Sequence, residues 1–382
     1  MDENLNPQQP ITRTPKKEQP LYEQIRRHLS TMIESGDLQP GANLPGKSSL
    51  AEQFNVNYRT INNALKLLEK EGLIKCIPNK KPVVIKNSGH RAGNDKITSI
   101  SFIRMFADPF SVSISKGINE FAEQNNIDCI ISDADNDYEK FIDSIKHSGN
   151  DINGLLIIPY EMPKCRQAVL DAINSGIEAV FIDRIIEGIE ACSVCSDHYS
   201  AAYQATKHLL QEQGLPVYHI GTIDEPSSCR QWVKGWRTAM NEFNYTETEK
   251  YLFKVGSSET ELATHSDDYN KSHIENAKNF FMNIKEEKYS IFAGNDYVAR
   301  GVYYACEKFG LKIAEDVFIA GISNLPFAQR LSVPLTSVDQ NLEKVGYESA
   351  KILYEKMLGI LPKPIHRVLP VNLIVRESSL RK

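Results

Sequence analysis

The sequence predicts an α/β protein in which a small N-terminal winged helix-turn-helix precedes a large two-lobed domain built on parallel sheets. Residues 20–86 are dense in apolar residues at helical spacing, whereas from Ile97 onward short apolar strands alternate with helices. This alternation runs in two consecutive series. Because strand–helix alternation produces a parallel sheet with helices on both faces, two series predict two lobes.

The N-terminal region opens with an amphipathic helix. Apolar residues recur every four positions from Leu21 to Ile33, on one helical face that is expected to end near Gly36. A short helix follows, and Ser48 or Ser49 is expected to cap it because both side chains can accept a hydrogen bond from the first turn.

A second short helix completes a helix-turn-helix. The first of the pair is expected to run to Phe54, and Asn57 is expected to cap the second, from Tyr58 to Glu71. Two short helices joined by the tight turn FNVN are typical of this motif. The apolar segments LIKCIP and PVVIK around PNKK then predict a small hairpin, the wing.

The chain is expected to divide into four segments, the last of them built from two lobes. They are a flexible arm (1–19), the winged helix-turn-helix (20–86), a polar linker (87–96) and the two-lobed domain (97–382), with lobe 1 at about 97–195 plus 325–358 and lobe 2 at about 196–324 plus 359–382.

Charge is distributed unevenly along the 382 residues. Residues 1–90 hold 13 Lys or Arg and 9 Asp or Glu, a net charge of +4, so residues 91–382 carry −9 of the total of −5. A basic head on an acidic body predicts that only the head binds a polyanion. The polar N-terminus lacks a secretory signal, and no apolar stretch approaches the roughly 20 residues of a membrane helix, so we expect a cytoplasmic protein without a membrane partner.

The seven cysteines are scattered, which is typical of free thiols in a reducing compartment. Cys192 and Cys195 have the spacing of metal ligands, but neither a second pair nor a histidine cluster follows them. The sequence therefore favours a position in or beside an apolar strand, and neither a metal nor a cofactor is expected.

Two families share these motifs. Residues 20–86 resemble the GntR family of winged-helix regulators, through QPLYEQIRRHL and SGDLQPGANLPGKSSLAEQFNVNYRTINNALKLLEKEGLI. Residues 97–378 resemble the effector domain of LacI/GalR repressors, itself similar to periplasmic sugar-binding proteins, through NGLLIIP, VFIDR, SDHYSAAYQATKHLL, GNDYVARGV, EDVFIAGISN, PLTSVDQ and VRESS. The fusion is similar to that of arabinose repressors. It implies a transcription regulator, most often a repressor released by a sugar, with an activator or a co-repressor as the alternative.

The DNA-binding residues are expected at the start of the second helix of the motif, which enters the major groove, and in the wing. The sequence departs from the GntR pattern at Ser48, Tyr58 and Asn62, where the family usually has Arg, so the operator sequence is expected to differ as well. The candidates are Lys47, Ser48, Asn57, Tyr58, Arg59, Thr60, Asn62, Asn63, Lys80 and Lys81.

The resemblance places the ligand-binding residues behind strands, where parallel sheets have their sites. Asp296 is the foremost candidate, with a helix N-cap formed by Asn295 or Asp296 as the alternative. Trp232 replaces the arginine usual in the family, and Arg230 is a candidate to reach the cleft instead. The candidates are Phe110, Ser111, Tyr160, Asp183, Arg184, Arg230, Trp232, Asn295, Asp296 and Asn324.

The usual acidic pair of the family is replaced by Ser323 and Asn324, which favours a neutral ligand such as a monosaccharide. Trp232 suits stacking on a sugar face, whereas Trp236 is expected in the core. Closure of the two lobes is expected to act through a homodimer on two DNA-binding heads bound to double-stranded operator DNA.

Two other classes of protein fit the sequence less well. A transport protein would carry a signal peptide and would have no use for residues 20–86. A hydrolase would need a paired acid and base or an activated nucleophile, and the pattern offers only single carboxylates in a binding cleft. We therefore expect no catalytic residues.

Overall fold

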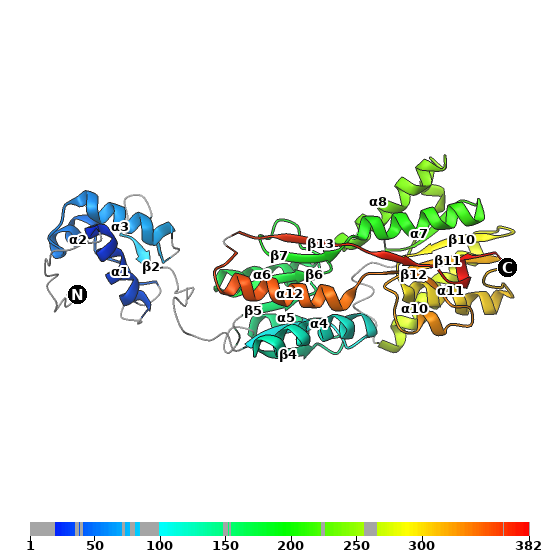
Figure 1. Ribbon diagram of the computed structural model, residues 1–382, viewed down its shortest axis with the longest axis horizontal. Helices are drawn as coiled ribbons and strands as arrows, with labels where there is room; N and C mark the ends of the chain where they lie inside the picture. The colour runs from blue at the N-terminus through cyan, green and yellow to red at the C-terminus, as the bar shows by residue number, and fades with distance from the viewer. Residues whose placement is uncertain are drawn as a thin grey trace. The chain divides into compact units, whose positions relative to one another are not determined.

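The computed structural model describes residues 20–34, 38, 41–70, 73–76, 81–84, 99–147, 152, 154–222, 226–255, 266–361 and 363–381. The chain divides into two compact units, Met1–Asn94 and Asp95–Lys382 (Figure 1). The predicted arm lies outside the described residues, and so does the predicted linker. Within those ranges, no helix is both long enough and apolar enough to cross a membrane.

The described residues of the N-terminal unit form three helices and a two-stranded antiparallel sheet. Its core contains Ile25, Leu29 and Ile33, which are at most 2% exposed, whereas Leu21 is 46% exposed. The elements are α1 (Leu21–Glu34), α2 (Lys47–Gln53), α3 (Tyr58–Lys70), β1 (Ile74–Lys75) and β2 (Val83–Val84).

Of the two helix N-caps predicted for this motif, one is confirmed and the other is wrong. Asn57 caps α3 as expected, because its Oδ1 accepts a hydrogen bond from the Thr60 backbone N–H at 2.8 Å. The prediction for α2 was wrong: Gly46 is the N-cap residue, with no side-chain bond, and Ser48 and Ser49 lie inside the helix. The helix therefore starts one residue before the first serine.

The first lobe of the C-terminal unit is a six-stranded parallel sheet in the order β13-β7-β6-β5-β3-β4. Helices α4 and α12 cover one face and α5 and α6 the other. The predicted strand position of Cys192 and Cys195 is confirmed, since both lie in β7. The elements are β3 (Ser99–Arg104), α4 (Pro109–Asn125), β4 (Asp128–Asp133), α5 (Tyr138–His147), β5 (Gly154–Ile157), α6 (Pro163–Asn174), β6 (Glu178–Ile182), β7 (Cys192–Ser196), α12 (Leu342–Met357) and β13 (His366–Leu369).

The second lobe repeats this arrangement in the order β14-β12-β11-β10-β8-β9, with β14 antiparallel to β12. Helices α7 and α8 pack on one face, and α10 and α11 on the other. The elements are α7 (His198–Gln213), β8 (Val217–Gly221), α8 (Ser227–Glu242), η1 (Thr248–Tyr251), β9 (Leu252–Lys254), α10 (Ser266–Asn283), β10 (Tyr289–Ala293), α11 (Asp296–Phe309), β11 (Val317–Ile322), η2 (Ala328–Arg330), β12 (Thr336–Asp339), β14 (Asn372–Ile374) and η3 (Glu377–Ser379).

Glycines allow α4 and α12 to approach closely. A Cβ atom at Gly117 would lie 1.7 Å from the Glu343 carbonyl oxygen, and one at Gly346 would lie 2.0 Å from the Ile114 carbonyl oxygen. Each distance is far below a van der Waals contact, so only glycine fits at these two crossing points. The pair lies along one face of the first lobe (Figure 1).

The chain crosses between the lobes three times, at Asp197, at residues 340–341 and at residues 370–371. The last crossing joins β13 to β14, the red segment that runs from one lobe to the other in Figure 1. The predicted lobe limits were therefore wrong in two places. Strand β12, assigned to lobe 1, belongs to the second sheet, and β13, assigned to lobe 2, belongs to the first. Local pattern does not reveal which sheet a four-residue strand joins.

Candidate functional site

A cavity of about 130 Å³ lies between the two lobes of the C-terminal unit. Much of its wall follows the carboxyl ends of β3, β5, β6, β10 and β11, the edge at which parallel sheets bind ligands. The remainder comes from the start of α4, the loop after β4, helix α8 and the crossing at 340–341. The lining residues are Arg104, Met105, Phe106, Asp108, Phe110, Ser111, Asn136, Ile158, Tyr160, Asp183, Arg184, Trp232, Asn295, Tyr297, Ser323 and Gln340.

Two buried N–H donors in this wall lack an acceptor within the described residues: Nε1 of Trp232 and Nε2 of Gln340. The Oε1 atom of Gln340 accepts from Ser323 Oγ at 2.9 Å, which fixes the orientation of the amide. A buried donor without an acceptor is costly, so a ligand that offers oxygen atoms would be stabilised here.

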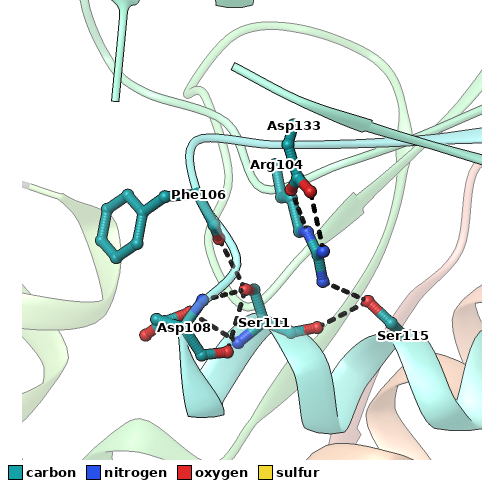
Figure 2. Close-up of polar contacts among 6 residues, drawn as sticks. All are labelled: Arg104, Phe106, Asp108, Ser111, Ser115 and Asp133. Carbon is teal, nitrogen blue, oxygen red and sulfur yellow. Dashed lines mark hydrogen bonds and ion pairs between the residues drawn. The ribbon is translucent and has the colours of Figure 1, made fainter. Parts of the chain in front are cut away.

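Arg104 is held rigidly at the end of β3 (Figure 2). Its Nη2 donates to Asp133 Oδ2 at 3.0 Å, its Nε bonds the other carboxylate oxygen, and its Nη1 donates to Ser115 Oγ at 2.9 Å. Ser115 in turn donates to the Ser111 carbonyl oxygen at 2.8 Å. The guanidinium thus enters the cavity wall with its charge compensated and its position fixed.

A second compensated pair lies behind β6. Arg184 Nε donates to Asp183 Oδ2 at 3.2 Å, and its guanidinium lies over the Tyr160 ring at 5.6 Å from the centroid. Asp183 adopts a left-handed backbone conformation, with φ of 68°. Such strain is concentrated at functional sites, because the surrounding structure must hold the residue in place.

Seven of the ten predicted ligand residues line the cavity: Phe110, Ser111, Tyr160, Asp183, Arg184, Trp232 and Asn295. Asn295 also caps α11, because its Oδ1 accepts from the Val298 backbone N–H at 2.9 Å. Trp236 packs in the core as expected, fully buried and donating to the Val217 carbonyl oxygen at 2.9 Å.

Asp296 does not line the cavity, which differs from the expectation that it faces the cleft. Its side chain is fully buried, with Oδ1 accepting from Ser337 Oγ at 2.6 Å and Oδ2 from the Leu325 backbone N–H at 2.8 Å. Asp296 is not the N-cap either, since Asn295 takes that role. Both carboxylate oxygens are engaged by the protein, and burial raises the pKa of Asp296 to about 7.

Arg230 and Asn324 also lie outside the cavity wall, contrary to expectation. Arg230 forms ion pairs with Glu161 and Glu187, and the Asn324 Oδ1 atom accepts from Arg376 Nη2 at 2.7 Å. In both cases the side chain is held outside the cavity wall by a charged partner that is distant in sequence.

Several lining residues were not among the candidates. Asp108 caps α4, accepting from the Ser111 backbone N–H at 2.9 Å, and also accepts from the Tyr297 hydroxyl of the other lobe at 2.9 Å. Arg104 and Asn136 had a usable signal, because they follow the first two strands of the series. The cavity-lining residues that the sequence analysis did not name as ligand candidates are Arg104, Met105, Phe106, Asp108, Asn136, Ile158, Tyr297, Ser323 and Gln340.

Six of the ten candidate DNA-binding residues lie at the start of α3, Lys47 and Ser48 lie at the start of α2, and Lys81 precedes β2. Asn57, Tyr58, Arg59 and Asn63 are exposed, and so are Ser48 and Lys81, whereas Lys47, Thr60 and Asn62 are half-buried. Lys47 Nζ donates to Asn62 Oδ1 at 2.9 Å, which ties α2 to α3. Lys80 lies outside the described residues.

Comparison with known proteins agrees with this organisation. Residues 21–84 match the model of the bacterial regulatory proteins of the gntR family, and residues 206–379 match that of the periplasmic binding protein-like domain. The HTH-type transcriptional repressor PurR of Vibrio atlanticus is 23% identical over 249 residues, which cover 65% of this chain and 71% of that protein. The arabinose metabolism transcriptional repressor of Geobacillus stearothermophilus is 22% identical over 377 residues, 95% of this chain and 99% of the relative.

A LacI family transcriptional regulator from Enterococcus faecium, solved with bound ribose, has the same fold over 75% of this chain and 100% of its own, with a TM-score of 0.61 and 21% identity. This chain joins a GntR-type helix-turn-helix domain to a periplasmic binding protein-like domain, and it is a ligand-controlled DNA-binding regulator.

Proposed function

We propose that this regulator represses transcription and is released from its operator by a small neutral sugar bound between the lobes. The observation that carries the proposal is the composition of the cavity wall, which combines aromatic faces with fixed polar groups from both lobes. Sugars present hydroxyl groups together with apolar ring faces, and such a wall matches both.

The charges of the wall favour a neutral ligand. Arg104 lies against Asp133, and Arg184 lies against Asp183, so each guanidinium is already compensated. The donors of Trp232 and Gln340 would bind hydroxyl or ring oxygens. The volume of about 130 Å³ is below the roughly 300–1,000 Å³ of pockets for drug-sized molecules, which suits a single sugar ring. The arabinose repressor and the ribose-bound regulator support the same ligand class.

The three crossings form a natural hinge. A ligand that binds both lobes stabilises the closed arrangement, and it changes operator affinity only through its different affinity for the two states. We propose that the change is transmitted through a homodimer to two DNA-binding heads on a two-fold operator. The protein would act in the cytoplasm, where the chromosome lies.

Intrinsic fluorescence tests the ligand. The chain has two tryptophans, of which Trp232 lines the cavity and Trp236 is buried in the core. Titration with L-arabinose and D-ribose is expected to give a saturable signal that Trp232→Phe removes and Trp236→Phe retains. A signal that follows Trp236 instead would contradict the assignment of this cavity.

Gel shifts on the native promoter test the direction of the response. The effective sugar is expected to weaken binding of the full-length protein. Stronger binding in its presence would make the sugar a co-repressor. Binding of a charged metabolite in place of either sugar would refute the neutral-ligand proposal.

A further inference from the structure

An ion-pair cluster bridges the two lobes beside the cavity. Arg230, in the first turns of α8, donates from Nη1 to Glu161 Oε2 at 3.0 Å and from Nη2 to Glu161 Oε1 at 2.9 Å. The same Nη2 donates to Glu187 Oε1 at 3.0 Å. Helix α8 belongs to the second lobe, whereas Glu161 precedes α6 and Glu187 follows β6, both in the first lobe.

The geometry gives the Glu161 pair more weight than an ordinary surface pair. The side chains of Arg230 and Glu161 are 33% and 14% exposed, whereas that of Glu187 is 73% exposed. Exposed ion pairs contribute little, but a two-pronged bond between a guanidinium and a partly buried carboxylate is both stronger and more directional. The hydrogen bonds that Arg230 donates to Glu161 are also the main cause of the raised pKa of Arg230.

The cluster lies directly beside residues of the cavity wall. Glu161 follows Tyr160, and Arg230 precedes Trp232 by two positions. Ile185 directly follows Arg184 of the cavity wall, and its backbone N–H donates to Ser227 Oγ across the same lobe boundary at 2.9 Å. Opening of the lobes at this edge therefore has to break the Arg230 pairs.

We propose that Arg230 and Glu161 form an inter-lobe latch. Arg230 is a positioning residue: it does not line the cavity, but it holds the lobes in the arrangement in which Tyr160 and Trp232 line one cavity. The latch favours this closed arrangement by about fivefold, the ratio that corresponds to roughly 1 kcal/mol. The effect of the latch on sugar affinity rests on the proposed function, whereas the latch itself does not.

Acrylamide quenching of tryptophan fluorescence in the full-length protein, without sugar, tests the latch. Trp232 is 9% exposed and Trp236 is 0% exposed, so the accessible signal reports Trp232 at the lobe boundary. Arg230→Gln and Glu161→Gln are each expected to increase quenching, and the double variant is expected to match Arg230→Gln, because the contact with Glu161 is already lost in that single variant. Raising NaCl to 1 M should open the wild type and leave Arg230→Gln unchanged.

Arg237→Gln is the matched control, because Arg237 also lies in α8 but pairs with Glu249 of the same lobe. Quenching that stays at the wild-type level in Arg230→Gln and Glu161→Gln, or that rises equally in Arg237→Gln, overturns the latch. Measuring sugar binding by the same variants distinguishes a failure of the latch from a failure of the proposed sugar ligand. Arg230→Gln should weaken L-arabinose or D-ribose binding about fivefold. Increased quenching in a protein that binds neither sugar supports the latch and contradicts the sugar proposal.

Discussion

Replacing Asp296 should affect folding stability rather than contact with the ligand. In Asp296→Ala, the Leu325 backbone N–H and the Ser337 hydroxyl lose the acceptor that each bonds in the folded protein. A buried polar group left unpaired costs roughly 1–3 kcal/mol, so the two together should cost about 2–6 kcal/mol of unfolding free energy. At roughly 2–4 °C per kcal/mol, the melting temperature of the C-terminal unit should fall by about 4–24 °C.

Asp296→Asn should behave differently. The amide can accept from Leu325 N–H through Oδ1 and donate to Ser337 Oγ through Nδ2, so both bonds survive without a buried charge. The pKa of Asp296 rises from 3.8 to about 7 on folding, so between about pH 4 and 7 the folded form keeps a proton that the unfolded form has released. The stability contributed by this group is therefore greatest at low pH and is lost as the pH rises, by at most about 4 kcal/mol.

Thermal unfolding of wild type, Asp296→Ala and Asp296→Asn at pH 5, 6, 7 and 8 checks this reasoning. The Asn variant should show a flatter pH profile than wild type and should match or exceed it at pH 8. An Asn variant as unstable as the Ala variant, or a wild-type profile parallel to that of Asn, would refute a buried carboxylate with a raised pKa. Sugar affinity of the Asn variant should stay within about twofold of wild type.

Four further substitutions probe the packing, the cavity and the DNA-binding head. Gly117→Ala should destabilise the first lobe by about 1–3 kcal/mol in thermal unfolding, because its Cβ atom would meet the Glu343 carbonyl oxygen; a variant as stable as wild type would contradict the close contact of α4 and α12. Trp232→Ala should reduce sugar affinity at least about tenfold by calorimetry while operator binding without sugar persists; unchanged affinity would place the ligand elsewhere. Lys81→Ala should weaken binding to all DNA sequences alike and lower the salt slope by about 1, whereas Arg59→Ala should relax base preference; a change of base preference in Lys81→Ala would exclude a pure phosphate contact.

Periodicity predicted most helices to within a few residues, because the helices bury a local apolar stripe. The second helix of the motif was expected over 58–71 and is α3, Tyr58–Lys70. Helix α4 was expected from Val112 but starts at Pro109, since Asp108 and Ser111 form a capping box and proline fits the first turn. The sequence contains this signal, so the start of α4 could have been predicted. The strands β13 and β14 were not, because each is short and pairs with a strand distant in sequence.

The sequence predicted only those site residues whose position follows from the end of a strand. Residues directly behind β6 and β10 line the cavity because the sheet edge places them there. Asp296 obeys the same rule of position, yet its partner Ser337 comes from β12, 41 residues later. Arg230 is held by Glu161, 69 residues earlier in the other lobe. Long-range partners of this kind decide where a polar side chain points, and no local pattern contains them.

The position of Asp296 changes which side chains can recognise the ligand. With that carboxylate saturated by Ser337 and Leu325, the second lobe offers the cavity Trp232, Asn295, Tyr297 and Ser323, none of which is charged. The charged groups of the wall all come from the first lobe, and its two guanidinium groups are already paired with carboxylates. Discrimination between sugars should therefore depend on hydrogen-bond geometry and ring stacking rather than on net charge. Epimers that differ at one hydroxyl would then differ in affinity because a single donor, such as Nε1 of Trp232, is left without its acceptor.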